Sequence, residues 1–453
     1  MIINLISYSH RKNIPFTLLS VVLFLIGSSS LFGDEPDAIN EDALFSDSET
    51  VVEMQEMVDD SVMTETDKPS IALSGSLYNR NYYSTVRDDY LLYNPDMDNG
   101  GEYTGSLTSN LLLDMRYKDG IKGFINSDFI YYFKGIYEPG EPDKTYADMA
   151  LREIFLDFNL SRKVYFRVGR QYLRWGRNYF WNPTDLINVD RKDFLDPNKN
   201  LQGTKGIRIH IPFGTKYNIY GFINLEDIDH FRDISYALKY EFLAGDTEMA
   251  FSGWYKKGFK PVFGYDFSTR FLLIDWRGEM SISRGDNQVS LLQAVDDTGN
   301  PYYTTVREDG KWFPKVSLGF TKSLELLDVN DRVTITGELY YNRSGYGYNI
   351  FDNQESALSL LYFGLYEPNH VSRYYGAVFS SIQRFIFSNA SFNFNVLSNL
   401  TDGSGTVYSS LNFVFKYDFF INLTMSSTFG DGRDEYTFSG NDKMYGLEFR
   451  YNF

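Results

Sequence analysis

The last nine residues of the chain alternate strictly between two kinds of side chain. Tyr445, Leu447, Phe449, Tyr451 and Phe453 are apolar or aromatic, and the residues between them are small, polar or charged. Successive side chains of an extended strand point to opposite faces, so this stretch predicts a strand with one apolar and one polar face. An aromatic final residue fits a closing strand that has lipid on one side and water on the other.

This ending resembles the C-terminal signal of bacterial outer-membrane β-barrel proteins, which the barrel-assembly machinery reads. The resemblance implies that Tyr445, Leu447, Phe449, Tyr451 and Phe453 form the membrane-insertion signal. It also implies a Gram-negative-type outer-membrane location, with outer-membrane lipid, lipopolysaccharide and the barrel-assembly machinery as partners. We therefore expect an all-β fold, a transmembrane antiparallel β-barrel that crosses the membrane many times.

The start of the chain has the order of a secretory signal. Arg11 and Lys12 precede an apolar run over residues 14–26, and small residues follow it up to Gly33. We expect a signal peptide over residues 1–33, too short to span a membrane comfortably. Residues 34–69 then carry thirteen acidic residues against one base. Such a segment is expected to be disordered in the periplasm, with a plug or partner-docking helix as the alternative.

Composition narrows the protein class. The chain has no cysteine, which excludes a disulfide framework and a thiolate metal site. Its 36 tyrosines and 38 phenylalanines accompany a negative mean hydropathy, which fits a barrel with one watery face better than a helical membrane protein. The net charge of −17 argues against nucleic acid as a partner. No metal or cofactor is expected.

From Ser70 onwards, apolar and polar residues alternate with a period of two. Each run has about the ~9–11 residues that a tilted strand needs to cross a bilayer. The pattern predicts a barrel over residues 70–453 with about eighteen strands, an even number as single-chain bacterial barrels have. The expected strands are 70–84, 103–117, 121–134, 149–160, 162–176, 203–213, 215–225, 232–243, 245–257, 260–269, 272–284, 312–325, 330–344, 374–387, 389–400, 406–417, 418–430 and 441–453. Alternation is weakest over 257–275, so sixteen strands is the alternative.

The connections between these strands alternate in length. Numbered back from a periplasmic C-terminus, the periplasmic turns are short, such as 118–120, 213–214 and 244–245. The external connections are long and include 85–102, 135–148, 177–202, 285–311, 345–373 and 431–440. Nothing in the geometry of a β-sandwich requires short and long connections to alternate in this way. We expect the long external loops to fold partly into the lumen.

Motifs for catalysis are weak. Only four histidines occur, no pair of them has helical metal-ligand spacing, and no nucleophile-elbow motif is found. His210 is expected to face the lumen, where a hydrogen-bonded structural role outweighs a catalytic one. We therefore expect no enzymatic activity.

One segment breaks the strand alternation. Val164, Phe166 and Val168 keep the lipid-facing phase, but Arg170 and Arg174 then fall on it. An arginine in lipid at mid-depth costs ~2–4 kcal/mol. Either a bulge near Gly169 reverses the two faces, or this stretch already lies above the membrane.

The same segment continues into a loop that is unusually apolar. It contains Trp175, Trp181 and an Asn182-Pro183 start for a helical turn, followed by Asp185. We expect it to pack inside the barrel mouth, with Trp175, Trp181, Asn182, Pro183 and Asp185 as its anchor. The Gly-Arg-Gln at 169–171 and the Trp-Gly at 175–176 resemble porin-like barrels of the alginate-export type. A motif that only braces the barrel wall is the alternative.

Charged residues of both signs are predicted to face the lumen, whereas alginate exporters have a strongly basic one. This departure counts against an anionic polysaccharide substrate. The charges either create a transverse field at a constriction or pair between neighbouring strands and brace the wall. The residues expected at the pore or constriction are Arg116, Asp157, Arg167, Arg170, Arg174, Arg177, Arg208 and His210.

These features predict a porin-like channel for diffusion of small polar or charged solutes, with or without substrate selectivity. The alternative is a non-conducting surface barrel that serves as an adhesin or receptor scaffold. The aromatic residues of loop 345–373 suit either an inward plug or a contact patch. The solute and the oligomeric state are left open.

Overall fold

The chain forms one large antiparallel sheet. The computed structural model describes residues 69–90, 101–117, 120–134, 146–187, 203–214, 216–226, 228, 230–295, 299–326 and 329–453. The expected signal peptide at 1–33, and the acidic segment at 34–69 except for Pro69, lie outside these residues.

Eighteen strands make up the sheet, and β10 and β11 both form across the region where the alternation is weakest. The expected number is confirmed, and the alternative of sixteen is wrong. The strands are β1 (Ser70–Val86), β2 (Glu102–Tyr117), β3 (Ile121–Lys134), β4 (Tyr146–Leu160), β5 (Val164–Gln171), β6 (Thr204–Phe213), β7 (Tyr217–Asn224), β8 (Ser235–Ala244), β9 (Thr247–Lys256), β10 (Val262–Phe271), β11 (Ile274–Arg284), β14 (Trp312–Leu326), β15 (Val329–Asn342), β16 (Tyr374–Gln383), β17 (Ala390–Asn399), β18 (Gly405–Phe415), β19 (Phe419–Phe429) and β20 (Asn441–Asn452).

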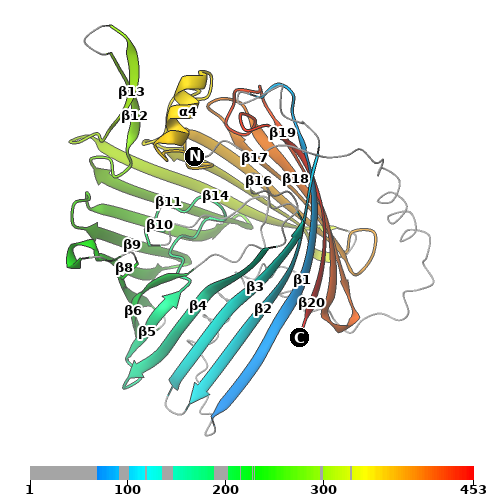
Figure 1. Cartoon of the computed structure of the whole chain (residues 1–453). Coiled ribbons are helices and arrows are strands. Elements are labelled where there is room, and N and C mark those ends of the chain that lie inside the picture. The colour runs from blue at the N-terminus through cyan, green and yellow to red at the C-terminus, as the bar shows by residue number, and fades with distance from the viewer. Residues whose placement is uncertain are drawn as a thin grey trace.

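The sheet closes into a barrel because β20 pairs with β1. The register sets Leu77 opposite Tyr451 and Tyr83 opposite Tyr445, and the Phe453 N–H donates to the carbonyl oxygen of Gly75 at 2.9 Å. In Figure 1 the blue β1 lies beside the red β20. Closure removes the unpaired edges that an open sheet would present.

Short turns lie at one end of the barrel and the long connections at the other. The turns after β6 and β8 contain Gly214 and Gly245 with φ of 64° and 66°, a backbone conformation that glycine adopts without strain and hairpin turns require. The opposite end carries a hairpin of β12 (Ser290–Val295) and β13 (Pro301–Val306), and helix α4 (Gln354–Tyr362). Both project from the barrel in Figure 1.

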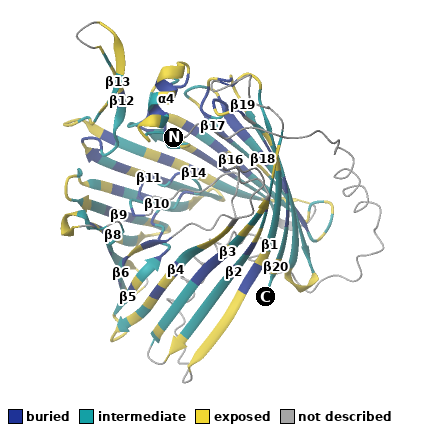
Figure 2. Cartoon of the chain, in the orientation of Figure 1, coloured by how far each residue is buried: buried dark blue, intermediate teal, exposed yellow. Residues whose placement is uncertain are grey.

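The outer face of the barrel is apolar. Leu107, Leu238 and Leu339 lie within strands, yet they are 45%, 58% and 61% exposed. Buried positions alternate with exposed ones along β14 (Figure 2). Leucines exposed in the middle of strands need a lipid environment, and the barrel is therefore of the transmembrane kind.

The only helices among the described residues are short. None of them is long and apolar enough to cross a membrane.

The residues of the expected insertion signal share the outer face. The register sets Tyr445 and Tyr451 opposite Tyr83 and Leu77, and Tyr451 and Phe453 are 43% and 50% exposed. Leu447 and Phe449 lie on the same phase between them. Their recognition by an assembly machinery stays a prediction.

Two elements differ from what the sequence predicts. The expected strand 162–176 is wrong at its end, because β5 stops at Gln171, where the chain turns inward. The connection 285–311 contains its own hairpin, because two alternating runs within it pair with each other from Ser290–Val306 to Val295–Pro301. Neither difference disturbs the alternation of short and long connections.

Candidate functional site: a loop fastened inside the barrel

The connection after β5 folds into the lumen. Its described part, residues 172–187, is termed the inner loop. The loop begins where the Tyr172 N–H donates to the Glu153 side chain at 2.8 Å, and its contacts then follow the inner wall from β8 to β16. Gly169 lies just before this bend with φ of 135°, and a Cβ there would meet the carbonyl oxygen of Ile154 at 2.2 Å. Only glycine satisfies both conditions.

Glu338 on β15 holds three consecutive backbone amides of the inner loop. The N–H groups of Tyr179 and Phe180 donate to one carboxyl oxygen at 3.0 Å each, and the Trp181 N–H donates to the other at 2.5 Å. The Ser317 hydroxyl adds a donor at 3.2 Å. Because Glu338 is only 3% exposed, losing its oxygens would leave these donors where an unmade hydrogen bond is costly.

Glu279 on β11 holds the neighbouring part of the inner loop. The N–H groups of Arg177 and Asn178 donate to its Oε1 at 2.5 and 2.7 Å. The N–H and hydroxyl of Thr184 donate to its Oε2 at 3.2 and 2.7 Å. Two wall glutamates therefore hold the loop backbone between Arg177 and Thr184.

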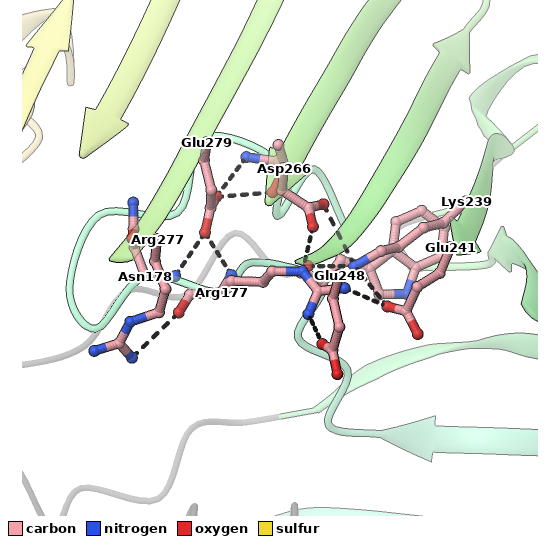
Figure 3. A network of polar contacts seen from close by, with 10 residues as sticks. Arg177, Asn178, Lys239, Glu241, Glu248, Asp266, Arg277 and Glu279 are labelled. Atoms are coloured by element: carbon pink, nitrogen blue, oxygen red, sulfur yellow. Dashed lines mark hydrogen bonds and ion pairs between the residues drawn. The ribbon is translucent and has the colours of Figure 1, made fainter. Parts of the chain in front are cut away.

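The Arg177 side chain is surrounded by three carboxyl groups of the wall (Figure 3). Its guanidinium donates to Asp266 at 2.5 Å, to Glu241 at 2.7 Å, and to Glu248. The Lys239 ammonium lies 3.5 Å from the second Asp266 oxygen. Arg177 is thus a cross-link between the loop and strands β8, β9 and β10, and its charge is balanced locally.

Both tryptophans of the inner loop are buried against the wall. Trp181 is 0% exposed and stacks on Tyr340 with ring centroids 5.5 Å apart, and its Nε1–H donates to the carbonyl oxygen of Asn369 at 3.1 Å. Trp175 is 5% exposed and packs with Leu173, Ile187, Phe222 and Ala237. A buried indole needs a partner for its N–H, and Trp181 has one in Asn369. The anchoring role expected for the two tryptophans stays a prediction.

Asn182, Pro183 and Asp185 form the bend of the inner loop. The Asp185 N–H donates to the Asn182 carbonyl oxygen at 3.0 Å, which closes a single turn with proline at its second position. No helix follows within the described part of this loop. Gly176 permits the bend, because a Cβ there would lie 2.3 Å from the Asn182 Oδ1.

The other residues expected at the constriction are spread along the barrel. Arg167 forms a two-pronged pair with Asp157 at 2.7 and 2.9 Å and lies 3.8 Å from the Phe155 ring centroid. Arg208 lies opposite Arg167 on β6. Arg116 pairs with Asp114 at 3.0 Å near the short-turn end of β2.

His210 is part of the wall. It is 6% exposed, its ring stacks on Tyr220 at 4.5 Å, and its Nε2 lies 3.1 Å from the Asn218 side-chain oxygen. This environment is that of a hydrogen-bonded structural histidine.

Arg170 does not join the arginines of the lumen. The register sets it opposite Ile154 and Lys205, which face outward, and its guanidinium lies 3.3 Å from Glu226 just beyond β7. Arg170 therefore keeps the outward-facing phase of Val168, and β5 ends at the next residue, Gln171. Arg170 was expected at the constriction, but it lies at the rim of the barrel and pairs with Glu226.

Several wall residues that receive the inner loop are not apparent from the sequence. Glu279 and Glu338 are recognisable only as lumen-facing acids, each preceded by a glycine. Gly264 and Gly319 also face the lumen, and a Cβ on either would lie 3.1 Å from a side-chain atom of Thr184 or Asn178. At these two positions the absence of a side chain leaves room for Thr184 and Asn178 of the loop.

External loops cover the Trp181 end of the inner loop. Glu435 in connection 430–440 is 2% exposed and accepts hydrogen bonds from the Tyr375 hydroxyl, the Asn399 amide and the Asn369 N–H at 2.7, 2.8 and 2.8 Å. Burial raises the pKa of Glu435 to about 8. Through these bonds the carboxyl group joins connection 430–440 to the connection that contains Asn369 and to the external ends of β16 and β17.

A hollow of about 330 Å³ lies on the external side of the inner loop. The loop contributes Arg174, Phe180, Asn182 and Asp185 to it, and the Arg174 guanidinium also donates to the Asn178 carbonyl oxygen. The remaining lining comes from the external ends of strands β9, β10, β11, β14 and β15 and from the connections beyond them.

No protein-family model matches the chain, and no curated protein matches its sequence. Solved structures do share its fold. Pseudomonas aeruginosa OccK9 (OpdG) has a TM-score of 0.53 at 8% identity over 84% of this chain and 98% of that one. A BenF-like porin from Pseudomonas fluorescens Pf-5 has 0.52 at 10% identity over 85% and 98%, and Pseudomonas aeruginosa OccK8 (OprE) has 0.50 at 11% over 84% and 98%. At these identities the similarity shows a shared β-barrel fold.

Proposed function

We propose that the chain is an outer-membrane channel for diffusion of small polar solutes, and that the inner loop narrows its lumen. The observation that carries this proposal is a closed eighteen-stranded barrel with a loop held inside it by Glu279, Glu338 and Arg177. A scaffold that only displays external loops has no need for a loop fastened across its interior.

The charges on the described wall support passage of solutes that are neutral or only weakly charged. Arg177, Arg167 and Arg152 each pair with wall acids, as does Arg80 with Glu448 at 2.6 Å. A paired cation attracts a passing anion less than an isolated one, because the adjacent carboxylate cancels most of its field beyond a few ångströms. We infer modest ion selectivity.

Reconstitution of the purified barrel into planar bilayers tests the proposal. A channel gives stepwise conductance increments that persist at low voltage. A variant with residues 173–186 replaced by a short glycine-serine linker should give larger increments, because the loop no longer occupies the lumen. A reproducibly silent barrel, folded by the criterion of heat-modifiable migration, would refute the channel.

A non-conducting adhesin or receptor scaffold is the second candidate, and the external surface favours it. The hairpin β12–β13 exposes Val295 at 65% and Tyr302 at 49%, and Tyr362 at the end of α4 is 85% exposed. Exposed aromatic residues on projecting elements suit contact with a partner protein. Silence in the bilayer together with binding to a surface ligand would establish it.

The remaining assignments belong to the same proposal. The apolar outer face fits lipid and lipopolysaccharide, and the C-terminal strand fits recognition by the barrel-assembly machinery. The 1–33 signal peptide and the 34–69 periplasmic segment complete the proposed organisation, with the barrel over 70–453. A relationship to alginate-export-type barrels rests on the 169–176 segment alone. We propose no enzymatic role.

A further inference from the structure

We infer that the hollow above the inner loop is a binding site for a neutral saccharide on its way into the channel. This inference rests on the proposed function, because it places the site on the external approach to the narrowed lumen. The hollow lies between the external ends of the strands and the inner loop, so a solute from outside meets it before the narrowing.

The size of the hollow suits a small solute. Its volume of about 330 Å³ lies at the lower end of the ~300–1,000 Å³ that small-molecule pockets occupy. That space holds one or two sugar rings and excludes a long polymer segment.

Aromatic rings form much of the hollow's wall. Trp254 and Phe259 meet edge to face at 6.0 Å on one side, and Phe180, Phe313 and Tyr340 contribute to the rest. The face of an aromatic ring carries partial negative charge, and the C–H groups on the flat side of a sugar ring carry partial positive charge. Such rings bind a saccharide without needing an ionic group.

Neutral hydrogen-bonding groups also line the hollow. Side-chain amides and hydroxyls both donate and accept, which matches sugar hydroxyls that do the same. Asn182 contributes a side-chain amide from the inner loop itself, and its Nδ2 group also donates to the Phe180 carbonyl oxygen at 3.3 Å. The neutral polar residues are Asn182, Ser281, Ser283, Asn287, Gln288, Ser344 and Asn369.

The charged groups of the hollow are balanced in sign. Arg174 and Lys315 are matched by Asp185 and Asp286. Lys315 donates to the Gln288 side-chain oxygen at 3.2 Å, and Asp286 accepts from the Gln288 N–H at 2.9 Å and the Ser344 hydroxyl at 3.0 Å. A site for a simple anion or cation would carry an excess of the opposite charge. This balance favours a neutral ligand.

Binding and conduction are measured separately so that the two proposals can fail separately. The folded barrel, in a detergent without a sugar headgroup, is titrated with maltose, gluconate and lysine as neutral, anionic and cationic probes, and binding is followed by calorimetry. Ion current through the reconstituted barrel is then recorded with each probe. We expect saturable maltose binding with a dissociation constant on the order of a millimolar, a matching block of the current, and much weaker responses to the other two.

Two variants locate the site. Trp254→Ala should weaken maltose binding about fivefold to tenfold, because one aromatic contact contributes roughly 1.0–1.4 kcal/mol and ~1.4 kcal/mol corresponds to tenfold. Tyr255→Ala is the matched control, because the adjacent Tyr255 lies on the outer face at 49% exposure, and it should bind maltose as the unaltered barrel does. Asn182→Ala removes a side-chain amide of the loop and leaves the strands intact, and it should also weaken maltose binding. It tests the site independently if Trp254→Ala does not fold.

The inference is overturned if maltose does not bind, if gluconate or lysine binds more tightly, or if both hollow variants bind like the unaltered barrel. A conducting barrel without maltose binding leaves the channel proposal standing. A silent barrel that binds maltose at this site refutes the channel, and with it the solute's passage.

Discussion

Replacing Glu338 with alanine should release the inner loop from the barrel wall. The carboxyl group accepts three consecutive loop amides, those of Tyr179, Phe180 and Trp181. No other group of the described chain is positioned to take over all three donors at once. The wall strand β15 keeps its ladder, because the substitution leaves the backbone pairing with β14 and β16 unchanged.

The size of the effect follows from these bonds. Each hydrogen bond to a carboxyl oxygen contributes about 1–3 kcal/mol, and a buried donor left without a partner costs a similar amount. Water in the lumen can hydrogen-bond to some of the freed N–H groups and so offsets part of this cost. We therefore expect the free energy that favours the docked loop to fall by roughly 3–5 kcal/mol. At ~1.4 kcal/mol per tenfold, the undocked population rises at least a hundredfold.

Single-channel recording in planar bilayers measures this change. Glu338→Ala should show a higher mean conductance and more open-channel noise than the unaltered protein, because an undocked loop clears the lumen intermittently. Thr336→Ala is the control: its hydroxyl faces the lumen from the same strand and pairs with Thr321 at 2.9 Å. If Glu338→Ala had the conductance and noise of the control, the loop would not depend on this carboxyl group.

Four further outcomes follow from the described contacts. Arg177→Met should make the channel more cation-selective, since it leaves Asp266, Glu241 and Glu248 with only the Lys239 ammonium of the described chain beside them; an unchanged reversal potential in a potassium chloride gradient would contradict this. Arg174→Ala should shift the reversal potential in the same direction by a smaller amount, and no shift would make this arginine structural. Trp181→Ala should cost about 3–5 kcal/mol, seen as a lower melting temperature, and should raise conductance; a variant that melts like the unaltered barrel refutes the anchor. Burial raises the pKa of Glu435 from 4.5 to about 8, so its contribution is fully present below pH 4.5 and is lost as the pH rises towards 8, by up to roughly 5 kcal/mol. The melting temperature should fall across that window, and Glu435→Gln should flatten the fall.

The strands were predictable from the sequence because each residue's face is a local property. Ile207, Ile209 and Ile211 alternate with Arg208 and His210, and the alternation alone separates lipid-facing from lumen-facing side chains. Even the weakly alternating β10 and β11 lie close to their expected positions, because hairpin geometry fixes where a strand must return.

The inner loop was predictable in outline but not in its contacts. Its two tryptophans indicated burial, yet the partners of Arg177 lie 64 to 89 residues away in sequence. The path of the loop across the barrel decides which lumen-facing acid it contacts. No sequence motif distinguishes Glu338 from the other lumen-facing acids. Arg170 shows the same limit, since its place depends on where β5 ends and the chain turns inward.

The inner loop also imposes an order on how the molecule is built. The loop follows β5, but the carboxyl group that accepts its amides arrives 157 to 159 residues later, on β15. Until that strand is in place the loop has no partner for those donors, and once β20 has paired with β1 the lumen is enclosed. Docking of the loop onto Glu338 therefore cannot precede the arrival of β15, and bringing such distant chain segments together is slow. Loss of the Glu338 carboxyl group alone would leave a barrel whose strands are all paired but whose inner loop is still undocked.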